Sequence, residues 1–83
     1  MKKYGNSSGQ SGVEAYETGP GFILVKFVRN GTYKYTVTSA GRAAIRHMKR
    51  LAAAGKGLST FISQFVRENY EEKIDDNKSR ATG

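Results

Sequence analysis

Apolar and polar residues alternate most clearly between positions 21 and 37, and this pattern predicts a β-hairpin. Its first half, Gly21–Arg29, is rich in β-branched and aromatic residues, and its second half, Thr32–Val37, alternates polar and apolar side chains. Asn30-Gly31 lies between the halves. This dipeptide tolerates the positive φ angles of a type I′ turn, whose twist matches that of paired strands.

A two-residue turn at Asn30-Gly31 fixes which residues of the hairpin share a face. The expected core face carries Phe22, Leu24, Lys26, Val28, Tyr33, Tyr35 and Val37. The expected outer face carries Ile23, Val25, Phe27, Arg29, Thr32, Lys34 and Thr36. With this register Phe27 and Lys34 would form a stacking surface for a single nucleic-acid strand. A bulged three-residue turn is the alternative, and it would shift the register.

Two amphipathic segments follow the hairpin and predict two helices. Thr38 or Ser39 can cap a helix that runs to about Ala54. Ser59 can cap a second helix, which we expect to fray beyond Ile74. The glycine after the first helix is a C-terminal stop signal.

The order of these elements predicts an α+β fold, in which a three-stranded antiparallel meander is followed by two helices packed on one face. The first strand is expected at Val13–Glu17, before the turn sequence Gly19-Pro20-Gly21. We expect residues 1–11 to form a flexible N-terminal arm, residues 12–74 to form a single domain, and residues 75–83 to form a disordered tail.

Charge is distributed unevenly along the chain, whose formal net charge is +7. No acidic residue lies between Glu17 and Glu68, whereas nine basic residues do. The same interval holds nearly all of the candidate core residues. The folded part is therefore strongly basic, and such a field attracts polyanions, of which nucleic acid is the default.

The first predicted helix places its basic residues opposite its apolar stripe. The apolar stripe is Ala44, Ile45, Met48, Leu51 and Ala52. No acidic residue is interleaved on this helix, so no salt bridge between successive turns relieves the repulsion of the cations. An anionic partner would relieve it. The predicted nucleic-acid-binding residues are Arg42, Arg46, Lys49 and Arg50 on this helix, Lys56 at its end, and Lys34 from the hairpin.

The loop Gly55-Lys56-Gly57 has two interpretations. Ser59 and Thr60 follow it at the start of the second helix, where free backbone N–H groups can bind a phosphate. The simpler alternative is a plain turn between two helices with a capping glycine.

Residue types that catalysis and metal binding require are scarce. The chain has no cysteine and a single histidine, His47, so disulfides, thiolate sites and a histidine metal cluster within one chain are not expected. Glu71-Glu72 and Asp75-Asp76 are paired carboxylates with no pocket implied around them. We expect no catalytic residue, no cofactor, no metal site and no membrane partner. The composition favours a cytoplasmic location.

Several short motifs occur in a defined order along the chain. They are Tyr16, Leu24-Val25-Lys26-Phe27, Asn30-Gly31-Thr32-Tyr33-Lys34-Tyr35 with Val37, Gly55-Lys56-Gly57-Leu58-Ser59-Thr60-Phe61-Ile62, and Tyr70. Together they resemble the KTSC domain, a small module found alone in bacteria and phages and at the C-terminus of some lysyl-tRNA synthetases. Thr38 stands where this family usually has proline. The resemblance implies three strands followed by two helices, association with nucleic-acid-related proteins, and no established catalysis.

These observations predict a small non-catalytic nucleic-acid-binding module that contacts mainly phosphates through a basic helix. One alternative is a protein-interaction or accessory module, such as a phage-encoded one, that docks on an acidic protein. Another is a helix-turn-helix DNA binder, in which the second helix presents Ser59, Thr60, Ser63, Gln64 and Arg67 to the bases. The sequence leaves open DNA or RNA, single or double strands, and monomer or homodimer.

Overall fold

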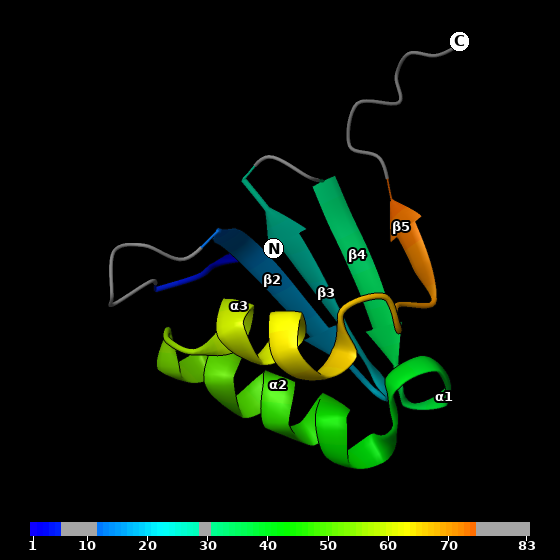
Figure 1. The fold of residues 1–83 in the computed structure, drawn as a ribbon. Helices are drawn as coiled ribbons and strands as arrows, with labels where there is room; N and C mark the ends of the chain where they lie inside the picture. The colour runs from blue at the N-terminus through cyan, green and yellow to red at the C-terminus, as the bar shows by residue number, and fades with distance from the viewer. Residues whose placement is uncertain (6–11, 29–30, 75–83) are drawn as a thin grey trace, which may run out of the picture.

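One antiparallel sheet and a layer of helices make up the part of the chain that the computed structural model describes, residues 1–5, 12–28 and 31–74 (Figure 1). The five strands lie in the order of the chain. They are β1 (Lys2–Lys3), β2 (Val13–Gly19), β3 (Phe22–Phe27), β4 (Gly31–Thr36) and β5 (Glu72–Ile74). The helices are α1 (Val37–Ala40), α2 (Arg42–Ala54) and α3 (Leu58–Phe61), which continues as a π-helical turn, η1 (Ile62–Val66).

The helices α2 and α3 cover one face of the sheet, as Figure 1 shows. The α+β class is therefore confirmed. The predicted arrangement of three strands followed by two helices is not confirmed, because β1 and β5 extend the meander at its two edges. Within the described ranges, no helix is both long enough and apolar enough to cross a membrane.

The predicted hairpin exists, but its predicted register is wrong. Val25 pairs with Tyr33 and Phe27 pairs with Gly31, so three residues separate the strands instead of two. An odd shift turns every side chain of one strand to the other face. Gly31, the first residue of β4, has a φ of 85°, which glycine adopts without a steric penalty. Arg29 and Asn30 lie outside the described residues.

The corrected register reverses the faces of β3. Ile23 and Val25 are fully buried under the helices, whereas they were expected on the outer face. Phe27 also faces the core side, where its ring meets Tyr33 edge to face at 5.5 Å between centroids. Lys34 lies on the opposite face of the sheet. The predicted stacking surface of Phe27 and Lys34 is therefore contradicted.

An irregularity in β2 places two large side chains in the core. The pairing of β2 with β3 shifts between Val13 and Ala15. A bulge of this kind adds one residue to one strand, so side chains an odd number of positions apart share a face. Val13 and Tyr16 are consequently both buried.

The predicted first helix is split in two. Thr36, not Thr38 or Ser39, caps the first piece: its side chain accepts a hydrogen bond from the Ser39 N–H, and the Ser39 hydroxyl accepts one from the Thr36 N–H, both at 3.0 Å. Gly41, with a φ of 98°, then separates α1 from α2. Gly55 ends α2 in the left-handed conformation, as predicted.

The second helix is shorter than predicted. It begins at Leu58 instead of after Ser59, and it ends in the π turn, where the Arg67 N–H donates to the Ile62 carbonyl at 2.6 Å. The chain then returns to the sheet. Ile74 pairs with Thr32 at the edge of β4, where a fraying helix end was expected. A strand that joins an exposed sheet edge satisfies backbone groups that would otherwise lack protein partners.

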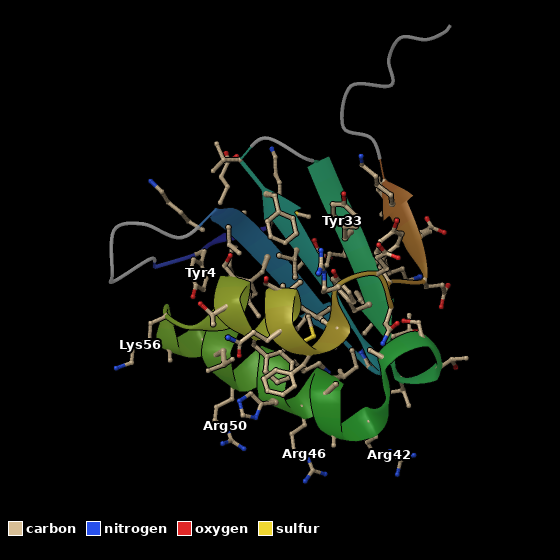
Figure 2. The ribbon with its side chains drawn as sticks, in the orientation of Figure 1. Tyr4, Tyr33, Arg42, Arg46, Arg50 and Lys56 are labelled. Atoms are coloured by element: carbon tan, nitrogen blue, oxygen red, sulfur yellow. The ribbon has the colours of Figure 1, made fainter. Side chains whose placement is uncertain are left out.

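The start of the predicted flexible arm belongs to the fold. Lys2 and Lys3 pair with β2, and Tyr4 is only 3% exposed. The Leu58 N–H donates to the Tyr4 hydroxyl at 3.2 Å, so this tyrosine joins the sheet edge to α3 (Figure 2). Residues 6–11 and the predicted tail, residues 75–83, lie outside the described residues.

The core lies between the helices and the corrected face of the sheet. From α2 it receives Ile45, Met48 and Ala52. From the strands and the C-terminal helical segment it receives Val13, Tyr16, Ile23, Val25, Tyr35, Leu58, Ile62 and Val66. The exposed side of α2 must therefore point away from the sheet.

We expect Tyr4→Phe to destabilise the protein by about 1–3 kcal/mol, because the buried Leu58 N–H loses its acceptor. Urea unfolding measures this change. Tyr33→Phe is the matched control, since the Tyr33 hydroxyl has no hydrogen-bond partner among the described residues. Equal stability of Tyr4→Phe and the parent would contradict a stabilising role for this hydrogen bond.

We expect stability to fall above about pH 10 through Tyr35. Burial raises the pKa of the Tyr35 phenol, and the neighbouring Tyr33 and Tyr70 phenols raise it further. The unfolded chain therefore loses this proton at a lower pH than the folded protein. The stabilisation is fully present below the unfolded pKa and is lost as pH rises toward the folded pKa.

Tyr35→Phe tests this pH dependence by urea unfolding at about pH 8 and about pH 11. The variant loses the hydrogen bond that the Tyr35 hydroxyl donates to the Arg67 carbonyl at 3.1 Å. It should thus be less stable than the parent by about 0.5–1.5 kcal/mol at the lower pH. The deficit should shrink at the higher pH. An unchanged deficit would show that Tyr35 does not titrate in this way.

Candidate nucleic-acid interface

A row of cations occupies the side of α2 that faces away from the sheet. Arg42, Arg46 and Arg50 extend outward along the helix, and Lys56 follows in the loop before α3 (Figure 2). All four side chains are exposed. We call these four residues the basic ridge. Successive arginines are one helical turn apart, so they advance by about 6 Å along the axis.

The basic ridge lacks acidic neighbours that would neutralise it. In the described part of the chain, none of its four side chains forms an ion pair or a hydrogen bond. Glu17 and Glu72, by contrast, lie on the sheet face that the helices leave uncovered, in one cross-strand row with Lys34. The cations of the basic ridge and these two carboxylates thus lie on different faces of the molecule.

Lys34 does not join the basic ridge. It lies opposite Glu72 on the neighbouring strand, and its Nζ is 4.0 Å from Glu71 Oε2. The same Nζ lies 5.5 Å from the centre of the Phe22 ring. Of the six residues predicted to bind nucleic acid, Lys34 alone is placed on the far face of the sheet.

Lys49 lies at the border of the basic ridge and is half buried. Its Nζ donates to the Gly19 carbonyl at 2.8 Å, which attaches α2 to the turn between β2 and β3. A groove of about 400 Å³ runs along this border. Its lining combines the apolar Val37 and Ile45 with three cations, Arg42, Arg46 and Lys49, and with Gly21.

The loop Gly55-Lys56-Gly57 forms a tight turn between α2 and α3. Gly55 and Gly57 both have positive φ, which lets the chain reverse direction within a few residues. The Leu58 N–H at the start of α3 donates to the Tyr4 hydroxyl and is therefore not available to a phosphate. The phosphate interpretation, which depends on Ser59 and Thr60, stays a prediction.

Three aromatic residues on the other border of the basic ridge were not predicted as site residues. They are His47 of α2, Phe61 of α3 and Phe65 of η1. The His47 and Phe61 rings stack at 4.6 Å with 10° between their planes. Phe61 and Phe65 lie 5.0 Å apart with 31° between planes, and Phe65 is 66% exposed.

The sequence contains a signal that could have predicted the exposure of Phe61 and Phe65. The apolar residues of the second helix form two stripes, and a short helix on a small sheet cannot bury both. Leu58, Ile62 and Val66 occupy one stripe and are buried. Phe61 and Phe65 occupy the adjacent stripe and lie progressively farther from the core.

Comparisons with known proteins give no family or relative: no protein-family model, curated protein or solved structure matches this chain. The resemblance to the KTSC domain therefore stays a prediction. The functional argument depends on the charges and side chains described above.

Replacing Lys49 separates its structural contribution from its charge. We expect Lys49→Met to lower stability by about 1 kcal/mol, because it removes the hydrogen bond to Gly19 but keeps the aliphatic stem. The exposed neighbour Arg46→Met, which has no such bond, should stay within about 0.5 kcal/mol of the parent. Urea unfolding of both variants measures the difference. A larger loss for Arg46→Met would contradict this assignment.

Proposed function

We propose that this protein is a small non-catalytic nucleic-acid-binding module whose basic ridge contacts mainly the phosphate backbone, and that it acts in the cytoplasm. The observation that carries the proposal is the row of four exposed cations with no acidic partner among the described residues. Helix α2 keeps its three arginines in one line, and Lys56 follows in the loop after it. Repulsion among them is relieved when an anion of repeating charge lies along the row.

The spacing of the arginines supports a polyanion over a single small anion. Arg42 and Arg50 are two helical steps apart, which corresponds to about 12 Å along the axis. An anion that contacts all three arginines must carry charges spread over about this length, as the phosphates along one nucleic-acid strand do. A single phosphate would engage at most two of them.

The resemblance to the KTSC domain supports the same proposal, because that family is associated with nucleic-acid-related proteins. An acidic protein could also satisfy the charge of the basic ridge. Nucleic acid is favoured because the ridge is a regular one-dimensional array of cations with a groove beside it that holds a further one, Lys49. The binding experiments below distinguish this proposal from the two alternatives, an acidic protein partner and a helix-turn-helix DNA binder.

Fluorescence anisotropy with labelled DNA and RNA, each as single and double strands, tests the proposal. Four phosphate contacts predict that the logarithm of affinity falls with the logarithm of salt concentration with a slope of about −3 for single strands. Affinity should accordingly drop roughly 50-fold between about 50 mM and about 200 mM salt. Independence from base sequence is expected, because phosphate contacts carry no sequence information.

We expect Arg46→Ala/Arg50→Ala to weaken binding to every nucleic acid roughly tenfold or more at low salt, and to make the salt slope shallower. The matched control is Lys34→Ala/Lys73→Ala, which removes the same charge from strands β4 and β5. The control should bind within about threefold of the parent, since only long-range attraction changes. If both double variants lost the same affinity, the effect would depend only on the net charge of the protein. That result would contradict a localised interface.

Two outcomes would replace the proposal. If the parent binds no nucleic acid at low salt, and nuclease-treated lysate still yields one stoichiometric acidic protein partner, the accessory-module alternative is correct. If selection from random DNA yields a defined motif that requires Gln64 or Arg67, the helix-turn-helix alternative is correct.

A further inference from the structure

Phe65 is an unusually exposed aromatic residue in a small protein. Among the described residues, the large hydrophobic side chains that stand open to solvent are Met1, Val28 and Phe65. Phe65 alone of these is aromatic, and its exposed fraction of 66% is the highest. Its position is set by regular structure, since it lies within the π turn η1 and beside the buried Val66. Exposure of this side chain therefore follows from the fold.

The rings of two neighbouring residues, Phe61 and His47, support the Phe65 side chain. Its ring contacts Phe61 at 5.0 Å, and Phe61 in turn stacks almost parallel on His47 of α2 at 4.6 Å. Phe61 is half buried and packs against the core. The three rings form a continuous column, which we call the aromatic stack. It runs from α2 to the surface of η1, so Phe65 presents a supported ring instead of a freely moving one.

The aromatic stack begins beside the basic ridge. His47 follows Arg46 directly in α2, and Arg50 lies three residues further on, one helical turn away. Residues three or four apart on a helix are neighbours at about 5–6 Å between Cβ atoms. A nucleic-acid strand whose phosphates contact Arg46 and Arg50 therefore passes the His47 end of the aromatic stack. Its bases can then reach the rings.

A hollow beside Phe65 supplies polar groups. Its volume is about 360 Å³, and it is lined by Gln64, Phe65, Val66, Arg67, Glu68 and Asn69. This volume lies at the lower end of the range for small-molecule sites, about 300–1,000 Å³. The Gln64 and Asn69 amides carry both donors and acceptors, which are the groups that base edges require. Arg67 and Glu68 contribute one charge of each sign to the lining, so the hollow has no net positive charge to attract a phosphate, and its amides suit the edge of an uncharged base.

We infer that the aromatic stack is a docking platform for an unpaired base of single-stranded nucleic acid, with Phe65 stacking on the base while Arg46 and Arg50 hold the neighbouring phosphates. This inference rests on the proposed function and narrows it to single strands. A duplex buries the faces of its bases between neighbouring pairs. An unpaired base exposes a face, and stacking on an aromatic side chain binds any base without reading sequence.

The first test compares Phe65→Ala with the parent on two single strands of about 12 nucleotides, an oligothymidine and an abasic strand with the same number of phosphates. Phe65→Ala should lose roughly 5- to 100-fold in affinity for the oligothymidine. Its affinity for the abasic strand and for duplex DNA should stay within about twofold of the parent, because these probes offer no free base face.

Val28→Ala is the matched control for this variant. Val28 is 60% exposed and follows directly after β3, outside the basic ridge and the aromatic stack, so it tests the loss of exposed apolar surface alone. It should bind all three probes like the parent. Circular dichroism and urea unfolding show whether each variant remains folded, and both should, since neither side chain belongs to the buried core.

A second test uses Phe65→Trp, because the chain has no tryptophan and this variant then carries a single fluorescent reporter. Tryptophan preserves the stacking surface, so affinity for oligothymidine should match or exceed that of the parent. Its fluorescence should be quenched by oligothymidine but not by the abasic strand or by heparin, which supply negative charge without bases. Quenching of equal depth by all three would overturn the stacking assignment.

The outcomes separate this inference from the proposed function. If Arg46→Ala/Arg50→Ala weakens binding while Phe65→Ala leaves oligothymidine affinity unchanged, the basic ridge binds nucleic acid and the aromatic stack does not contribute. If no probe binds at low salt, both proposals fail. If Phe65→Ala weakens the oligothymidine and abasic complexes equally, the effect is not stacking, and the inference is overturned.

Discussion

The packing of α2 on the sheet is the contact on which the other features of this molecule depend. Ile45, Met48 and Ala52 are buried against a sheet face that includes Ile23 and Val25. Each large apolar side chain buried in this way contributes about 1.5–3 kcal/mol. Because a helix has one fixed rotation about its axis once that stripe is buried, its arginines must point outward. The hydrophobic contact thereby sets the direction of the positive field.

Small domains have little apolar area to bury, and this fold adds specific polar links between the layers. Tyr4 accepts a hydrogen bond from α3, Tyr35 donates one to the chain after η1, and Lys49 donates one to the turn after β2. Each joins a helical segment to a different part of the sheet. The basic ridge and the aromatic stack thus lie on a layer whose position relative to the sheet is fixed at three points.

In the proposed recognition, charge binds the phosphates and stacking binds an unpaired base. Phosphate contacts act at long range and weaken with salt, so they bring any nucleic acid to α2. Stacking acts only on contact and requires an unpaired base. It contributes roughly 1–3 kcal/mol of binding free energy per stacked base. The basic ridge alone would bind duplexes and single strands alike. The aromatic stack adds a preference that charge cannot supply, and it does so beside the same helix.

Local patterns in the sequence determined the features that depend on neighbouring residues. The strands β2 to β4, the amphipathic α2, its stop at Gly55 and the exposed arginines follow from periodicity and glycine chemistry within a few residues. Tertiary contacts decided the rest. The register of β3 and β4 depended on one extra loop residue, and β5 and Tyr4 gained their places from partners distant in the chain. Phe65 was left outside because the sheet has room to bury only one of the two apolar stripes, a competition between surfaces that no local pattern records.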